Sequence, residues 1–231
     1  MAEDLAGWTE RARPPRTPMQ GRTVRLEPLD PERHGAALFR AAEGPGADPR
    51  LWDWMAVGPF GSEAAFRAWL DPLPASEDPL FFAILTEPDG VPRGMASFLR
   101  ITPAHGVIEI GHIWLGVGLQ RTTAATEAMW LLARRAFDEL GYRRLEWKCD
   151  TRNARSRRTA LRLGFAFEGI FHQHMVIKGE NRDTAWFALL DRDWPRADAA
   201  FRAWLDPANF GPDGQQRRRL EEIRASLAGP T

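Results

Sequence analysis

The feature that most constrains this chain is an apolar segment that leads, through a short polar loop, into an amphipathic helix. The segment GVIEIGHIWLGV (106–117) is typical of a buried strand, and GLQRTTAATEAM (118–129) carries the loop and the helix start. Apolar residues at helical spacing continue to Leu140, and Gly141 is a typical helix-ending residue. Such a unit is typical of α/β folds, and the free N–H groups of its helix N-terminus favour an anionic ligand.

Further strands and helices are predicted on both sides of this unit. Strands are predicted at 22–29, 79–87, 91–101 and 142–150, and on both sides of the turn at 178–181. Helices are predicted from Asp30-Pro31 to Ala42, from Ser62 to Pro72, and from Asn153 to Gly164, where the first residues are typical N-terminal caps. This order predicts a mixed sheet covered by helices on both faces.

The predicted organisation is one domain at residues 21–194 with an extension at each end. Residues 1–20 are rich in Pro and Arg and predict a flexible arm, and residues 195–231 predict one helix followed by a polar tail. The sequence lacks a run of about 20 apolar residues, and its acidic N-terminal segment differs from a signal peptide. We therefore expect a cytoplasmic protein with no membrane partner.

Composition argues against several other classes of protein. Lysine and arginine total 31, as do aspartate and glutamate, so the basic excess typical of nucleic-acid-binding proteins is missing and a nucleic-acid partner is not expected. The single cysteine, Cys149, excludes an intramolecular disulfide and a cysteine-based metal cluster. His172 and His174 share one face of a predicted strand but lack a third ligand nearby, so no metal is expected.

A second motif, NARSRRTALRLGF at 153–165, changes the interpretation of the loop. Together with EIGHIWLGVGLQRTTAATEA, it resembles the GNAT superfamily of acyl-CoA-dependent N-acetyltransferases, over roughly residues 20–194. The resemblance is greatest to the RimJ/RimL-like branch, which contains the ribosomal-protein-alanine acetyltransferases. It implies an α/β GNAT fold with a mixed, largely antiparallel central sheet and helices on both faces. It also implies acetyl-CoA as acyl donor and a homodimer formed through the late hairpin or the C-terminal helix.

The resemblance assigns the cofactor-binding residues. The family's loop pattern, Gln/Arg-x-x-Gly-x-Gly/Ala, falls on residues 120–125, with Thr123 where glycine is usual, and this departure bears on how tightly a pyrophosphate is held. The backbone from Leu115 to Val117 is expected to pair with the pantetheine, and Asn153 to contact the pantetheine arm. The expected pyrophosphate contacts are Gln120, Arg121, Thr122, Thr123, Ala124, Ala125 and Thr126.

Acetyl transfer by direct attack of an amine in a ternary complex requires a base, for which Glu109 is the first choice and His112 the alternative. Glu109 lies inside the apolar strand, where a carboxylate is costly unless it is paired or used in catalysis. The alternative for Glu109 is a solvent-facing position or an ion pair with an arginine. His112 has a suitable pKa, but regular pleating points it away from the side of Glu109, whereas a bulge would change that.

The family's usual proton donor for the leaving sulfur, a tyrosine, is missing here, because its position falls on Ala160. The only tyrosine of the chain is Tyr142. The RimL-like pattern implies Ser156 as the hydrogen-bond donor to the sulfur, and the alternative is that Ser156 supports the helix start. Losing a general acid costs roughly 10²-fold in rate, so turnover is slowed rather than abolished.

The acceptor is not identified by the sequence. Aromatic residues in the expected acceptor region suit either an apolar acceptor or an ordinary core; they are Trp52, Trp54, Phe60, Phe66, Trp69, Phe171 and Trp186. The leading hypothesis is an N-acetyltransferase acting on a protein N-terminal α-amine or a small amine. The alternative is a CoA-binding regulatory or structural module with weak or no turnover. Arg155, Arg158 and Arg162, a basic stripe at helical spacing, either meet the 3′-phosphate of CoA or form a solvated helix face. They are also the one feature that favours a third hypothesis, a nucleic-acid-binding module.

Overall fold

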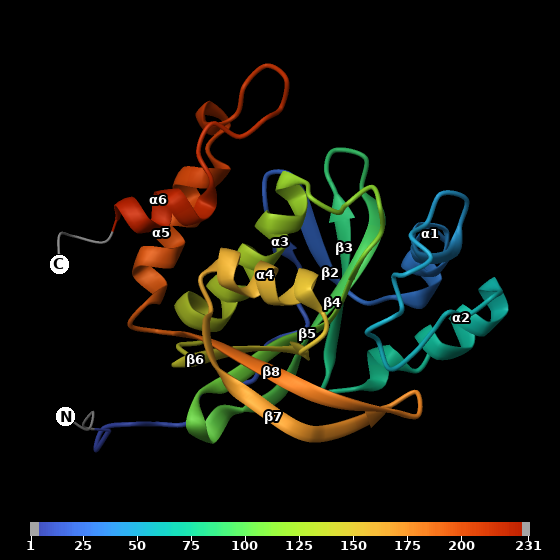
Figure 1. Cartoon of the computed structure of the whole chain (residues 1–231), viewed down its shortest axis with the longest axis horizontal. Helices are drawn as coiled ribbons and strands as arrows, with labels where there is room; N and C mark the ends of the chain where they lie inside the picture. The colour runs from blue at the N-terminus through green and yellow to red at the C-terminus, as the bar shows by residue number, and fades with distance from the viewer. Residues whose placement is uncertain (1–4, 228–231) are drawn as a thin grey trace.

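The structure is a computed structural model that describes residues 5–227, in which eight strands form one sheet in the order β1-β2-β3-β4-β5-β6-β8-β7 (Figure 1). The strands are β1 (Met19–Gln20), β2 (Val24–Pro28), β3 (Leu80–Thr86), β4 (Val91–Thr102), β5 (Val107–Leu115), β6 (Arg144–Asp150), β7 (Ala166–Ile177) and β8 (Glu180–Leu190). Neighbouring strands are antiparallel except β5 and β6, which are parallel. The predicted mixed, largely antiparallel sheet is confirmed.

Helices cover both faces of this sheet, as predicted. They are α1 (Pro31–Glu43), α2 (Glu63–Leu70), α3 (Thr123–Arg134), α4 (Ala154–Leu163), α5 (Trp194–Leu205) and α6 (Leu220–Ser226). Shorter helical turns are η1 (Leu73–Ala75), η2 (Pro103–His105), η3 (Arg135–Glu139, a π-helical continuation of α3) and η4 (Pro207–Asn209). One face carries α1 and α2, whereas α3 and α4 lie on the other, with α5 and α6 beside them (Figure 1).

The predicted caps start and end the helices where the sequence placed them. The Asp30 side chain accepts hydrogen bonds from two backbone N–H groups of α1, and the Ser62 hydroxyl accepts one from the backbone of α2. Asn153 caps α4, which ends at Gly164 with a left-handed φ of 104° that a side chain would strain. Each side-chain cap stabilises its helix by about 1 kcal/mol.

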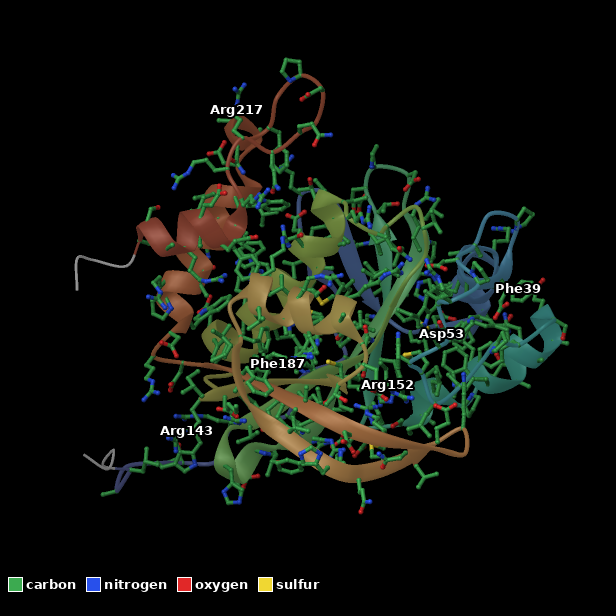
Figure 2. The ribbon with its side chains drawn as sticks, viewed as in Figure 1. Phe39, Asp53, Arg143, Arg152, Phe187 and Arg217 are labelled. Atoms are coloured by element: carbon green, nitrogen blue, oxygen red, sulfur yellow. The ribbon has the colours of Figure 1, made fainter. Side chains whose placement is uncertain are left out.

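The smaller of two cores lies between the sheet and the α1/α2 layer. Phe39 of α1 packs on Phe66 of α2 with ring centroids 5.7 Å apart (Figure 2). Phe66 and Trp52 are buried, and Phe60 and Trp69 pack against them at centroid distances of 5.2–6.0 Å. The core interpretation therefore holds for Trp52, Phe60 and Phe66, whereas Trp69 packs on this core and also lines a cavity beside His112.

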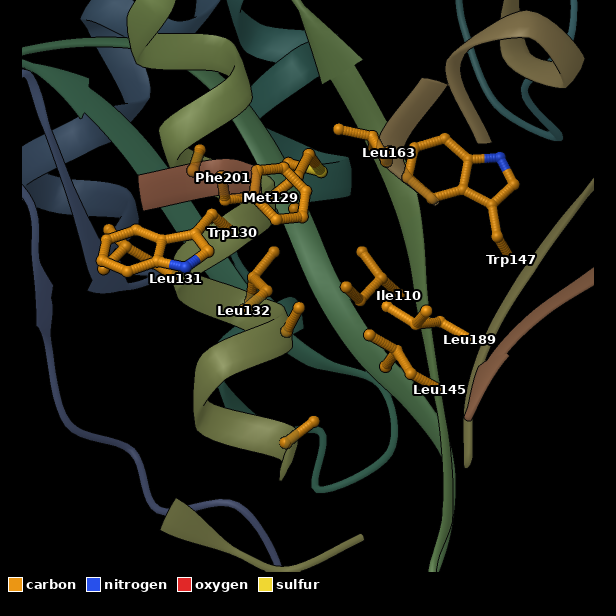
Figure 3. Close-up of a cluster of buried hydrophobic side chains, with 14 of the residues drawn as sticks. Ile110, Met129, Trp130, Leu131, Leu132, Leu145, Trp147, Leu163, Leu189 and Phe201 are labelled. Atoms are coloured by element: carbon orange, nitrogen blue, oxygen red, sulfur yellow. The ribbon is translucent and has the colours of Figure 1, made fainter. Parts of the chain in front are cut away.

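The larger core lies on the other face and fixes α3 on the sheet. Figure 3 shows Met129 and Leu132 of α3 directed at the apolar side chains of Ile110, Leu145 and Leu189, which come from β5, β6 and β8. The strand that enters the loop and the helix that leaves it therefore share one apolar interface. This interface holds the N-terminus of α3 at the end of β5.

The C-terminal extension contains more structure than the predicted single helix and polar tail. A second helix, α6, buries Leu220 and Ile223, and Arg224 donates hydrogen bonds to the carbonyl oxygens of Leu161 and Arg162 at the end of α4. Two apolar residues at a spacing of three are too short a pattern to predict a helix in a charged segment. The last four residues of the predicted tail lie outside the described range.

The N-terminal extension lies along the domain. Trp8 donates a hydrogen bond to the Ala104 carbonyl, Tyr142 donates one to the Ala12 carbonyl, and the side chain of Arg135 donates two to the carbonyls of Thr17 and Pro18. The first four residues of the predicted arm lie outside the described range. The flexibility of the arm, and the division of the chain at residues 20 and 194, stay predictions.

Candidate active site

The centre of the sheet opens where its two parallel strands separate. β5 and β6 pair only over Val107–Glu109 with Arg144–Glu146, although β5 continues to Leu115 and β6 to Asp150. The N-termini of α3 and α4 follow these two strands and lie at the same edge of the sheet (Figure 1). Ligands of open α/β sheets bind outside the carboxyl ends of the strands, and this edge is the candidate site.

The loop at this edge presents backbone donors to a ligand. Thr122 caps α3: its hydroxyl accepts a hydrogen bond from the Ala125 N–H and donates one to the Leu119 carbonyl. Within residues 5–227, the N–H groups of Thr123 and Ala124 find no acceptor, because they lie in the first turn of the helix. Two free donors and the positive end of the helix dipole make this position suitable for a phosphate group.

The loop geometry does not require glycine at position 123. The left-handed residue of the loop is Arg121, with φ 61°, and Thr123 is the first residue of α3. A threonine is tolerated by helical backbone, so the departure from the family pattern introduces no backbone strain. What Thr123 changes is the side chain beside the free N–H groups.

Some of the side chains expected to bind the cofactor have partners elsewhere or face solvent. Gln120 donates a hydrogen bond of 2.9 Å to the Leu115 carbonyl, and the Val117 side chain is exposed. Thr126 is buried, and its hydroxyl accepts a hydrogen bond from Arg162 of α4. The structure thus brings residues 115–125 together, whereas the Thr126 side chain belongs to the α3/α4 contact.

Asn153 and Ser156 meet at the start of α4. The Asn153 side-chain oxygen accepts a hydrogen bond of 3.0 Å from the Ser156 N–H, which leaves the Asn153 side-chain amide group as a donor. The Ser156 hydroxyl accepts one of 2.9 Å from the indole of Trp147, and its own proton is within reach of the Cys149 sulfur. The helix start is therefore held by Asn153, and the Ser156 hydroxyl is not the cap.

Burial raises the pKa of the neighbouring Cys149 thiol, which fits a core residue rather than a nucleophile.

Glu109 is held in a buried cluster of charges. Its carboxylate lies 2.9 Å from the ammonium of Lys148 and 3.1 Å from the guanidinium of Arg100, and Lys148 also contacts Glu146 at 2.6 Å. Burial raises the pKa of Glu109, whereas Lys148 and then Arg100 oppose this effect. Glu109 therefore does not face solvent. It forms the expected ion pair with an arginine, Arg100, and a second ion pair with Lys148.

His112 lies in a bulge of β5. The register moves from Ser97↔Gly111 to Met95↔Trp114, so β5 has an extra residue, and His112 adopts a left-handed φ of 48°. Its ring lies 5.3 Å from that of Phe81, on the α1/α2 face. The expectation from regular pleating is therefore wrong, since the bulge turns His112 to the face that Glu109 occupies.

A serine on the next strand orients the His112 ring. Ser97 donates a hydrogen bond of 3.1 Å to the Gly111 carbonyl, so its oxygen is an acceptor for the Nδ1–H of His112 at 2.9 Å. This tautomer carries the free lone pair on Nε2. Burial lowers the pKa of His112, which keeps the ring neutral at pH 7. The sequence contains no local signal for Ser97, because the contact joins two strands through the bulge.

The loop between α1 and α2 crosses toward the late strands. The Arg152 guanidinium lies over the Trp54 ring at 5.3 Å, and Figure 2 shows Arg152 beside the segment that carries Asp53. Lys178, in the β7–β8 turn, donates a hydrogen bond of 2.9 Å to the Trp52 carbonyl. These contacts hold the loop close to the candidate site.

Arg155 and Arg162 of the basic stripe, and the two histidines, contact different side chains. Arg155 contacts Asp48 at 3.4 Å, whereas Arg162 lies over the Trp204 ring, so the stripe is split between two environments. His172 and His174 bond to different partners, Asp183 and Thr184. Among residues 5–227, no group of three or more His, Cys, Asp or Glu side chains could hold a metal ion.

Within the same residues, none of the helices has the length and apolar character that crossing a membrane requires.

Comparison with known proteins identifies the class of protein. Residues 23–166 match the family described as "Acetyltransferase (GNAT) domain", and because this is more than half of the chain, the chain belongs to that family. The family carries out acyl transfer, and the chain is accordingly an acyltransferase of the GNAT N-acetyltransferase type.

Solved structures show the same relationship. A GCN5-related N-acetyltransferase from Brucella melitensis is 48% identical, and the alignment covers 96% of this chain and 100% of that chain with a TM-score of 0.93. A protein from Chromobacterium violaceum ATCC 12472, described among "probable acetyltransferases (GNAT family)", is 44% identical over 84% of this chain and 96% of its own, with a TM-score of 0.77.

A curated relative agrees with the branch predicted from the motifs. The Bacillus subtilis (strain 168) protein described as "Putative ribosomal N-acetyltransferase YdaF" is 29% identical over 106 residues. The match covers 46% of this chain and 57% of the Bacillus protein.

Proposed function

We propose that this protein transfers the acetyl group of acetyl-CoA to a primary amine by direct attack in a ternary complex. The observation that carries the proposal is the convergence of two helix N-termini at the opening between β5 and β6. Donors for a pyrophosphate come from Thr123 and Ala124, and Leu115, whose strand no longer pairs with β6 at this point, lies at the start of the same loop. A fold relative with 22% identity and a TM-score of 0.64, the self-immunity acetyltransferase MccE, is described in complex with acetyl-CoA and AMP.

In this proposal His112, rather than Glu109, takes the proton of the attacking amine. A general base needs a free lone pair and a pKa near the working pH. His112 has its Nδ1 engaged by Ser97 and is kept neutral by burial, which leaves Nε2 for the amine. The Glu109 carboxylate is already the partner of two cations. Glu109 then acts by holding the strands beside the opening.

Ser156, in the first turn of α4, completes the proposed machinery. Its hydroxyl proton is not used by the helix cap, so it can donate a hydrogen bond to the sulfur as the thioester breaks. A thiol has a pKa of about 8.5, so the thiolate leaves readily and a hydrogen bond is sufficient help. The absent family tyrosine at position 160 is thus compatible with turnover.

The acceptor amine has two candidate sources, a protein N-terminus and a small molecule. The name of the Bacillus relative, a ribosomal N-acetyltransferase, favours a protein N-terminal α-amine. A cytoplasmic location and a homodimer formed through the β7–β8 hairpin or the C-terminal helix complete the proposal.

Binding of acetyl-CoA distinguishes this proposal from a protein that lacks a working cofactor site. At about 100 times Kd, acetyl-CoA adds about 2.7 kcal/mol to the free energy of unfolding, which raises Tm by roughly 5–10 °C for a chain of this length. In Thr123→Glu, a carboxylate beside the free N–H groups repels the phosphates, and the rise in Tm is lost. The matched control is Thr159→Glu, at a half-buried position on α4, which keeps the rise.

Release of free CoA thiol with a panel of amines then separates an enzyme from an inactive CoA-binding module. Amine-dependent release supports the proposal. A rise in Tm without release for any amine supports the inactive module, and no rise at millimolar acetyl-CoA contradicts both.

A further inference from the structure

A cavity of about 260 Å³ opens beside His112 on the α1/α2 face of the sheet. Its walls come from the loop after α1, the end of α2, η1 and the start of β3. Apolar surface is contributed by Met55, Val57, Trp69, Leu73 and Phe81. We call it the acceptor cavity.

We propose that the acceptor cavity holds one uncharged apolar substituent of the amine acceptor, about as large as a leucine or phenylalanine side chain. The amine itself then lies beside Nε2 of His112. This inference rests on the proposed function, in which His112 is the base. It adds the chemical class of the acceptor.

The size of the cavity limits the substituent. Pockets for whole drug-sized ligands are about 300–1,000 Å³. A cavity of about 260 Å³ therefore suits a single side chain or one ring, with the rest of the acceptor in solvent. A peptide N-terminus and an arylalkylamine share this chemistry.

The lining of the cavity disfavours charged substituents. Its residues include no aspartate or glutamate, so a second cation on the acceptor finds no counter-ion there. Glu109, the buried carboxylate on this face of β5, is already paired with Lys148 and Arg100. A carboxylate on the acceptor finds no cation either, because burial keeps His112 neutral. Burying an unpaired charge is costly, and an apolar group fits with no such penalty.

The cavity is distinct from the closed core beneath it. Trp52 and Phe66 are buried in that core, whereas Met55 and Val57 are half-buried and Ala56 on the same loop is exposed. The cavity thus opens to solvent through the loop between α1 and α2, which provides a route for the acceptor.

The first test compares amines whose substituents differ in charge. Using acetyl-CoA and the wild-type chain, kcat/KM is measured for phenethylamine, 1,4-diaminobutane and 4-aminobutyrate. It is also measured for peptide amides that begin with Leu, Lys or Glu. We expect the apolar member of each set to exceed both charged members by about tenfold or more. A higher kcat/KM for the Leu peptide than for phenethylamine points to a protein N-terminus, and the reverse points to a small amine.

The second test changes the cavity itself. Ala56→Phe fills it from an exposed position, and Leu73→Asp places a carboxylate in its wall. We expect each variant to raise KM for phenethylamine by about tenfold or more, with KM for acetyl-CoA unchanged. The control is Leu161→Asp on the exposed surface of α4, which leaves both values unchanged. If Leu73→Asp does not fold, Ala56→Phe decides the result.

The two proposals fail in different ways. Absence of acetyl-CoA binding, or of turnover with every amine, overturns the proposed function and this inference with it. Turnover that favours a charged acceptor or shows no preference overturns the acceptor cavity alone, as does an unchanged KM for phenethylamine in Ala56→Phe.

Discussion

Replacing Lys148 with methionine tests the buried charge cluster that positions β5 and β6. The Lys148 side chain is 4% exposed and lies between the carboxylates of Glu109, at 2.9 Å, and Glu146, at 2.6 Å. Its ammonium also lies 3.7 Å from the centroid of the Trp186 ring. Methionine fills a similar space but leaves two buried carboxylates without their shared cation.

The expected loss of stability follows from these contacts. Removing one partner of a buried ion pair costs about 3–5 kcal/mol, because the remaining charge stays desolvated. For a chain of this length, each kcal/mol corresponds to roughly 2–4 °C, so Tm falls by about 6–20 °C. Arg100 and Arg144 still contact Glu109 and Glu146, which places the loss toward the lower end of this range.

The pH dependence of Lys148→Met has a defined sign. Burial already raises the pKa of Glu109, and loss of Lys148 raises it further. A carboxyl group with a raised pKa in the folded state binds protons more tightly when folded, so a lower pH favours the folded state. The stability difference between wild type and variant therefore shrinks from pH 8 to pH 5.

Urea unfolding followed by tryptophan fluorescence at both pH values measures these differences. Arg158→Met, at an exposed position on α4, is the control and is expected to change stability by less than about 0.5 kcal/mol. A loss below about 1 kcal/mol for Lys148→Met at pH 8, or an equal loss at both pH values, refutes the reasoning.

Two further predictions concern Ser156 and His34. Ser156→Ala is expected to lower kcat by about 10²-fold and Tm by a few °C, because the buried Trp147 indole loses its acceptor; an unchanged kcat in a steady-state thiol-release assay contradicts its role. His34 is buried, and burial lowers its pKa below 6.5 although Glu27 opposes the effect. The unfolded state therefore binds a proton first, and wild type is expected to lose stability as pH falls below 6.5, by up to about 1.4 kcal/mol per pH unit for this group. Urea unfolding at pH 7 and 5.5 should show a smaller loss in His34→Gln, and an equal loss refutes the assignment.

Local sequence signals were sufficient to predict the fold. The caps at Asp30, Ser62 and Asn153, and the glycine at 164, fix helix boundaries through contacts within a few residues. The apolar run of β5 and the helical pattern after it depend on the same short-range periodicity. The exceptions are α6, whose burial comes from contacts with α4 and α5 rather than from its own pattern, and the two-residue strand β1, which lies inside the predicted arm and pairs with β2.

The site was less predictable because its decisive contacts join distant strands. The bulge at His112 gives a left-handed φ to a residue other than glycine, and Ser97 on β4 bonds to its ring. The partners of Glu109 come from β4 and β6, and the sequence shows only that a carboxylate lies in an apolar strand. At Thr123, the helical backbone introduces no strain, whereas the effect of its side chain on pyrophosphate binding stays a prediction.

The central claim is that His112 is the base and Glu109 is a structural charge, and the pH dependence of kcat in two variants tests it most directly. With saturating acetyl-CoA and amine, wild-type kcat is expected to fall on the acid side with an apparent pKa below 6.5, the direction in which burial shifts His112. His112→Gln should lose about 10²–10⁴-fold in kcat and lose this acid limb, with its fold intact. Glu109→Gln should show the same fall of kcat at low pH as wild type and keep most of kcat when the rate is divided by the concentration of folded protein. Its Tm should be lower than that of wild type. The opposite pattern, in which Glu109→Gln abolishes turnover and His112→Gln retains it, would contradict the account.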